Sequence, residues 1–143
     1  MSYDLVAFDP AAAPRERTAF LGWIKTALSE TPSAGDPAAA APELWAWRND
    51  MSQTFPAADA PGAFDPYSPS ETRNASYRFA NKLVIASLHW DVSGQAIYQA
   101  RRSAQAHRIG LFDASGTDRC VWMVSGRGRF EIVHSDANEY GAL

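Results

Sequence analysis

The sequence is poor in the residues that build crosslinks and metal centres. Cys120 is the single cysteine among 143 residues, and the chain has three histidines, at His89, His107 and His134. One cysteine excludes an intramolecular disulfide and argues against a zinc site made of thiolates. No two histidines stand at a spacing typical of metal ligands. We therefore expect an apolar core to hold the fold together, with no metal and no cofactor.

Long apolar runs and a basic excess are also missing. No apolar run approaches the length of a membrane-spanning helix, about 18 residues. The first residues lack the basic region and apolar stretch of a signal peptide, so we expect a cytoplasmic protein without a membrane partner. The formal net charge is -3, which argues against a nucleic-acid-binding protein because such proteins have a dominant basic face.

What the sequence does contain is typical of a globular domain. Hydrophobic residues make up 46% of the chain and aromatic residues 12%. A chain of this length and composition can bury an adequate core. We expect one domain over residues 1–143.

The strongest local pattern is an apolar run rich in aromatic and β-branched residues. It covers Tyr77–Ala80 and Leu83–Trp90, and only Asn81 and Lys82 interrupt it. Asn tolerates the left-handed backbone that a two-residue turn requires. The pattern predicts a β-hairpin, with Trp90 at the end of the second strand and in the core.

Three amphipathic helices are predicted around this hairpin. Apolar residues at helical spacing indicate a first helix from Pro14 to about Ser29, a second from Pro42 to Phe55, and a third that begins at Asp91 or Ser93 and stops at Gly110. The predicted core stripes are Phe20, Trp23, Ile24, Ala27 and Leu28; Leu44, Trp47, Met51 and Phe55; and Ala96, Ile97, Ala100 and Ala104.

The remaining strands complete an α+β pattern. Short apolar runs predict strands at Tyr3–Phe8 and Leu111–Ala114, and a C-terminal hairpin of Cys120–Ser125 and Arg129–His134. The order corresponds to a ferredoxin-like βαββαβ sandwich with an extra helix after the first helix and an added β-hairpin. The ferredoxin-like core would span residues 1–116, the hairpin 117–135 and a tail 136–143.

Right-handed crossovers in that fold would put the first and third helices on one face of the sheet. Val6 and Phe8 would then face the helices beside Val84, Ala86 and Leu88. The opposite face would be partly apolar, so we expect the C-terminal hairpin, a second copy of the chain or a partner to cover it.

A set of residues spread along the chain suggests a relationship to known proteins. The residues are Tyr3–Pro10, Pro14, Arg15, Phe20, Trp23, Leu44, Trp47, Thr54–Pro56, Tyr77, Ala86–Trp90, Ala96, Tyr98 and Gly110–Asp113. This pattern, over roughly residues 3–116, resembles a family of small uncharacterised bacterial proteins. Members of that family are often encoded near polymorphic-toxin and type VI secretion clusters. The resemblance implies an immunity-like protein that neutralises a cognate toxin, and it implies no catalytic residues.

The candidate partner-binding residues are acidic and aromatic. The long loop predicted at 57–75 contains Asp59, Asp65 and Glu71 with Phe64 and Tyr67 among them. A loop of this length inside a compact domain is usually functional or disordered. Its carboxylates would steer a basic toxin surface, and its aromatic side chains would bury against that surface.

Two tryptophans are further candidates for anchoring a partner. Trp45 lies about 100° from the core stripe of its helix, and Trp122 lies in the C-terminal hairpin. The alternative interpretation is that both close the edges of the core.

Other functions stay open at this stage. An apolar open sheet face, with His89 in a pocket, would suit a small-ligand-binding protein or a cofactor-dependent enzyme, in a monomer or a homodimer. A purely structural or oligomerisation module is a third alternative. The glycine-rich Ser125–Gly128 lacks the ending of a phosphate-binding loop, so we interpret it as a hairpin turn.

Overall fold

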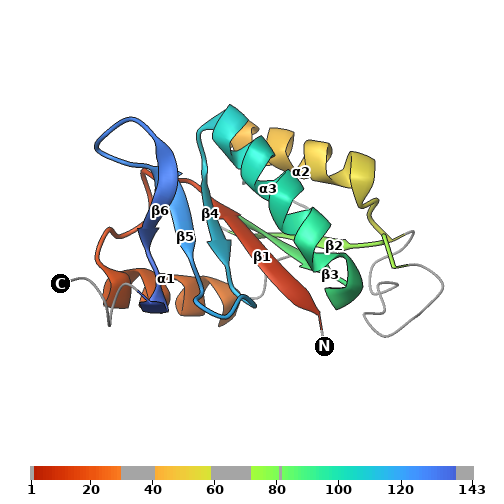
Figure 1. Ribbon diagram of the computed structural model, residues 1–143, viewed down its shortest axis with the longest axis horizontal. Coiled ribbons are helices and arrows are strands. Elements are labelled where there is room, and N and C mark those ends of the chain that lie inside the picture. The colour runs from red at the N-terminus through yellow and green to blue at the C-terminus, as the bar shows by residue number, and fades with distance from the viewer. Residues whose placement is uncertain (1, 30–40, 59–71, 81, 138–143) are drawn as a thin grey trace.

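The computed structural model describes residues 2–29, 41–58, 72–80 and 82–137, and Figure 1 shows their arrangement. The elements in chain order are β1 (Tyr3–Phe8), α1 (Arg17–Ser29), α2 (Pro42–Thr54), β2 (Ser76–Ala80), β3 (Leu83–Leu88), the short 3-10 helix η2 (Trp90–Val92), α3 (Ser93–His107), β4 (Gly110–Asp113), β5 (Val121–Val124) and β6 (Phe130–His134).

The strands form one six-stranded sheet in the order β2-β3-β1-β4-β5-β6. Every neighbouring pair is antiparallel, and β1 lies between β3 and β4. Both predicted hairpins are present, as β2-β3 and β5-β6. The prediction of a mixed α+β protein with an antiparallel sheet is therefore confirmed, whereas the ferredoxin-like topology is not.

The helices cover both faces of this sheet. In Figure 1, α2 and α3 lie above the sheet and α1 lies below it. The two apolar clusters of the core show the same arrangement. One contains residues of α2, α3 and the sheet, and the other contains residues of α1 and the sheet. The prediction that the first and third helices share a face is wrong. The helix that lies beside α3 is α2.

The prediction of which β1 and β3 residues share a face of the sheet is wrong, because β1 is shifted by one residue relative to β3. Leu5 is opposite Ala86, and Ala7 is opposite Val84, so these residues face α2 and α3. Val6 and Phe8 face α1 instead. The reason is that β1 and β3 are buried on both faces, and a strand covered on both sides carries no polar alternation that fixes its register.

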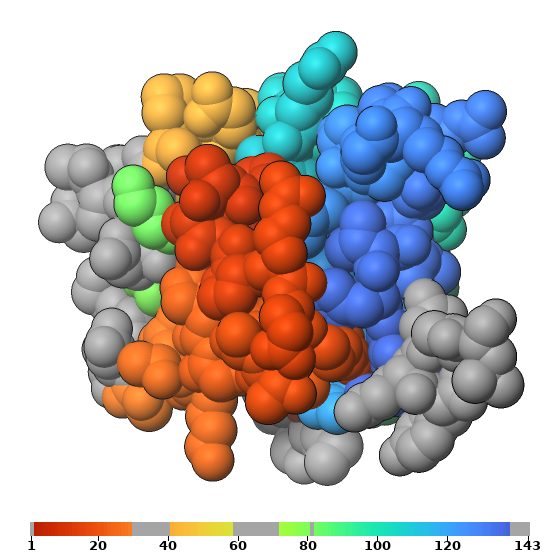
Figure 2. All heavy atoms as spheres, turned by 90° about the vertical axis from the view of Figure 1, so that its left-hand side faces the viewer, coloured from red at the N-terminus to blue at the C-terminus, as the bar shows by residue number. Residues whose placement is uncertain are grey.

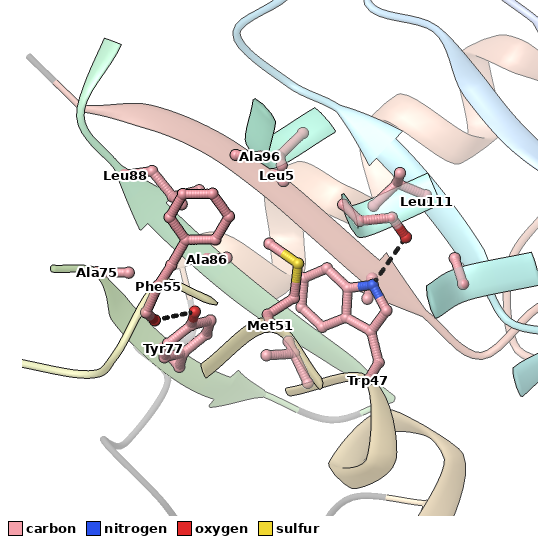
Figure 3. Packing of buried hydrophobic residues seen from close by; sticks show 14 of the residues in the cluster. Leu5, Trp47, Met51, Phe55, Ala75, Tyr77, Ala86, Leu88, Ala96 and Leu111 are labelled. Atoms are coloured by element: carbon pink, nitrogen blue, oxygen red, sulfur yellow. Dashed lines mark hydrogen bonds between the residues drawn. The ribbon is translucent and has the colours of Figure 1, made fainter. Parts of the chain in front are cut away.

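The larger core lies between the sheet and the α2-α3 layer. Figure 3 shows Trp47, Met51 and Phe55 packed against Leu5, Ala86 and Leu88 of the sheet. The indole N–H of Trp47 donates a hydrogen bond of 3.1 Å to the Ala100 carbonyl of α3. The apolar stripe predicted for the second helix is confirmed, since all four of its residues are fully buried.

The smaller core lies under α1. Phe20, Ile24 and Ala27 are buried there as predicted, while Leu28 is exposed. The helix begins at Arg17, three residues later than predicted, because the Glu16 carboxylate accepts hydrogen bonds from the backbone N–H groups of Thr18 and Ala19. These two hydrogen bonds lower the pKa of Glu16, and the bond from Ala19 has the larger effect.

The end of α3 differs from the sequence prediction. Arg108, with φ of 56°, adopts the left-handed conformation that stops the helix, and Gly110 is the first residue of β4. A side chain at Gly110 would collide with the ring of Phe8. The glycine is therefore required by the close approach of β4 to that ring, and not by the end of the helix.

We predict that Gly110→Ala lowers the free energy of unfolding by about 1–3 kcal/mol, because the added methyl group overpacks the Phe8 site. Gly22→Ala in α1 is the matched control, since nothing lies within 4 Å of its added methyl. That control should stabilise the helix by about 0.5–1 kcal/mol. Urea denaturation measures both, and equal effects would contradict the packing argument.

Candidate functional site

The large aromatic side chains that remain exposed gather on η2 and α3. Trp90 is 46% exposed and Tyr98 is 62% exposed. Tyr98 lies on the outer side of α3. The other exposed large apolar residues among those described are Leu28 of α1 and Ile132 of β6.

Trp90 was predicted to be a core residue, and this is wrong. β3 ends at Leu88, so Trp90 leaves the strand and forms the first residue of η2. One part of its ring packs edge-on against Tyr3, with 4.7 Å between the ring centroids. Nearly half of the side chain is left for solvent or a partner.

The outer face of α3 combines an aromatic ring with arginines. Tyr98, Arg101, Arg102 and Gln105 stand at i, i+3, i+4 and i+7, and all four are exposed. We call these four residues the α3 stripe. The Arg102 guanidinium lies 5.7 Å from the centre of the Tyr98 ring, and the Arg101 guanidinium lies 5.0 Å from the Trp122 ring on β5.

Two of the predicted anchors are described, and both pack against the protein. Trp122 is only 7% exposed and lies beneath Arg101. Trp45 is partly buried and stacks on Phe79 with 4.4 Å between centroids. These placements favour the alternative that the two tryptophans close the edges of the core. Their role in partner binding stays a prediction.

The other predicted partner-binding residues, Asp59, Phe64, Asp65, Tyr67 and Glu71, lie outside the described residues. The chain on either side of them is held together. The Ala58 backbone N–H donates to the Ala75 carbonyl, and the Ala75 N–H donates to the Pro56 carbonyl. The two ends of the segment are thus fixed beside the end of α2.

A polar bridge joins α2 to α3. The Asp50 carboxylate accepts hydrogen bonds from the Ser103 hydroxyl at 2.6 Å and pairs with the His107 ring at 2.9 Å. The hydrogen bond from Ser103 has the largest effect on the pKa of Asp50 and lowers it, and the contact with His107 lowers it further. The serine and the histidine both contact the carboxylate, so this arrangement is not that of a nucleophile activated by a base. It ties the two helices together.

A second polar pair is buried at the start of β1. The Tyr3 hydroxyl donates a 2.6 Å hydrogen bond to the Asp113 carboxylate, and both side chains are buried. Desolvation raises the pKa of Asp113, although the bonds from Tyr3 and Gly116 oppose that rise. Burial and the neighbouring Asp113 also raise the pKa of Tyr3. The pair joins β1 to the end of β4.

Removing the Tyr3 hydroxyl should leave Asp113 buried with one donor fewer. We predict that Tyr3→Phe lowers the free energy of unfolding by about 1–3 kcal/mol. Tyr98→Phe is the matched control, because the same hydroxyl is lost from an exposed ring, and it should change stability by less than about 0.5 kcal/mol. If the two variants unfold at the same urea concentration, the Tyr3–Asp113 bond contributes nothing.

The third polar group fixes α1 to the last strand. Arg17 donates to the Nδ1 atom of His134 at 2.9 Å and to Asp136 at 2.7 Å, and Arg119 pairs with the other Asp136 oxygen at 2.7 Å. Figure 2 shows the start of α1 and the segment before it beside β6. His134 accepts from an arginine, so its Nδ1 atom carries no proton. Desolvation and then the Arg17 charge lower the pKa of His134.

This network predicts how stability depends on pH. The unfolded chain binds a proton at His134 more readily than the folded protein does, so stability should fall as the pH drops below about 6.5. The bonds from Arg119 and Arg17 lower the pKa of Asp136 from 3.8 to about 2. The contribution of Asp136 to the stability of the fold should be complete above about pH 4 and be lost as the pH falls toward 2.

Thermal unfolding between pH 8 and pH 2 measures this dependence. His134→Gln should flatten the loss of stability between pH 7 and pH 5 and leave the loss below pH 4 unchanged. An unchanged slope between pH 7 and pH 5 would contradict the assignment of that step to His134.

The described residues contain no group of three or more His, Cys, Asp or Glu side chains placed to hold a metal ion. Cys120 is partly buried, and burial raises the pKa of its thiol. Within the same ranges, none of the helices has both the length and the apolar character needed to span a bilayer. No family model matches the chain, and no curated protein or solved structure is detectably similar to it.

Proposed function

We propose that this protein acts by binding another protein, as an immunity protein that occludes a cognate bacterial toxin, and that it is not an enzyme. One observation carries the proposal: Tyr98 is 62% exposed beside Arg102 of the α3 stripe, and Trp90 of η2, which directly precedes α3, is 46% exposed. Tryptophan, tyrosine and arginine are the residue types that supply most of the binding energy in protein interfaces.

The polar side chains inside the fold support the same proposal. Asp50, Asp113 and Asp136 each bind neighbouring side chains that join two elements of the fold. A carboxylate engaged in this way stabilises the structure. The surface of the protein is therefore the better candidate for function.

The second candidate is a small-ligand-binding protein or a cofactor-dependent enzyme. It requires an open apolar face of the sheet, and α1 packs on that face with Phe20, Ile24 and Ala27. His89, the histidine proposed for its pocket, is 4% exposed. The packing of α1 on that face counts against the second candidate and favours the first.

We also propose a finer description of the fold. The order β2-β3-β1-β4, with α2 and α3 on one face, corresponds to a ferredoxin-like unit in which α2 takes the position of the first crossover helix. In this view α1 is the added helix, and β5-β6 extends the sheet beyond β4.

Co-expression with the product of the adjacent gene tests the proposed function. If the neighbour is a toxin, it should stop bacterial growth alone, and this protein should restore growth and co-purify with it. A neighbour that is harmless alone, or that stays toxic beside this protein, would contradict the proposal. An unrelated acidic protein of similar size is the control.

A further inference from the structure

We infer that the partner docks on the α3 stripe and extends over Trp90 of η2, which directly precedes α3, through a surface that presents carboxylates. This inference deepens the proposed function, because it names a contact surface and the chemistry of the partner there. It rests on the charge, exposure and ring contacts of Tyr98, Arg101 and Arg102. The basic partner surface expected opposite Asp59, Asp65 and Glu71 is a separate prediction.

The two arginines are held in place by aromatic rings. Arg102 lies over Tyr98 and Arg101 over Trp122, at 5.7 Å and 5.0 Å from the ring centres. Both distances lie within the range of a cation–π contact, and such a contact leaves guanidinium N–H groups to donate to a carboxylate. A side chain that keeps such a contact on binding loses less conformational entropy than a fully free one.

Their charges are not neutralised within the described part of the chain. The ion pairs there involve Arg17 and Arg119 with Asp136, and His107 with Asp50. Neither Arg101 nor Arg102 takes part in one. An acidic surface is therefore the complementary one, and paired opposite charges both speed association and set orientation.

A protein fits this surface better than a nucleic acid does. The whole chain has a formal net charge of -3, whereas a nucleic-acid-binding protein has a dominant basic face. The exposed rings of Trp90 and Tyr98 supply apolar contacts for a protein partner, and the arginines supply polar ones.

The first test uses a peptide of ten glutamates as the probe, titrated into the ¹⁵N-labelled full chain and followed by NMR. We expect amide shifts concentrated at residues 98–105. R101E/R102E should weaken binding by at least about tenfold, because charge-assisted hydrogen bonds become repulsions. R101K/R102K should bind with intermediate strength, since lysine keeps the charge but lacks the planar fork.

R127E/R129E is the matched control, because it makes the same charge change at exposed residues of the β5-β6 turn. It should leave binding at the stripe nearly unchanged. Three results would overturn the inference: no shifts at 98–105, an equal loss in the control, or tighter binding of a ten-nucleotide single-stranded DNA at the same residues.

The second test separates this inference from the proposed function. In the complex with the adjacent gene's product, R101E/R102E should release the partner and R127E/R129E should not. If both variants bind like the original protein, the docking surface is wrong and the proposed function stands. If the original protein does not bind that product, the proposed function is wrong. The peptide titration alone then tests whether the α3 stripe binds carboxylates.

Discussion

Phe20→Ala is expected to lower the free energy of unfolding by about 3–5 kcal/mol. Phe20 is fully buried, and its ring meets those of Phe8, Phe112 and His134 at centroid distances of 5.1, 5.4 and 5.1 Å. Phe8, on β1, and Phe112, on β4, belong to the two strands at the centre of the sheet. The substitution would therefore open a cavity where α1 meets the sheet.

Leu28→Ala is the control for Phe20→Ala. Leu28 lies on the same helix and is exposed, so its loss should cost less than about 1 kcal/mol. Urea denaturation followed by tryptophan fluorescence measures both variants. A loss below about 1 kcal/mol for Phe20→Ala would mean that α1 does not cover this face of the sheet.

Trp47→Ala should have an effect of similar size on the opposite face, about 3–5 kcal/mol. Trp47 is the largest of the fully buried side chains described, and its N–H donates to the Ala100 carbonyl on α3. Truncation would leave a cavity between α2, α3 and the sheet and would remove the hydrogen bond that joins the two helices.

Trp47→Phe separates these two contributions. Phenylalanine fills most of the space but cannot donate a hydrogen bond, so it should cost less than alanine and still destabilise the protein by about 1 kcal/mol or more. If Trp47→Phe were as damaging as Trp47→Ala, the cavity would not be the main cause. If both variants were as stable as the original protein, the placement of α2 would be wrong.

The sequence predicted the elements well because their signals are local. Pro42 begins α2, and the residues at Leu44, Trp47 and Met51 form its buried stripe. Similarly, small apolar residues on α3 identify the face that packs on the sheet. Periodic patterns and proline positions contain this information without any tertiary context.

The layer that each helix joins could not be predicted in the same way. β1 and β3 are apolar on both faces, so their sequences do not say which residues face which helix. Both α1 and α2 are amphipathic, and either can cross over a sheet. The choice depends on long-range packing, such as the contact between Phe20 and Phe112.

The candidate site was only partly visible in the sequence. The helical spacing of Tyr98, Arg101 and Arg102 puts them on one face of a helix, whereas the contact of Arg101 with Trp122 depends on the fold. Trp90 was assigned to the core because it ends an apolar run. The aspartate and the serine that follow it, Asp91 and Ser93, are the signal that the strand ends before Trp90.

Amide hydrogen exchange of the protein, alone and with the adjacent gene's product, tests the central claim most directly. We predict slower exchange in the complex at residues 90–105, because a bound partner covers Trp90 and the α3 stripe, with little change in α1 and β6. Unchanged exchange over residues 90–105 in a complex that has formed, or protection confined to α1 and β6, would contradict the account.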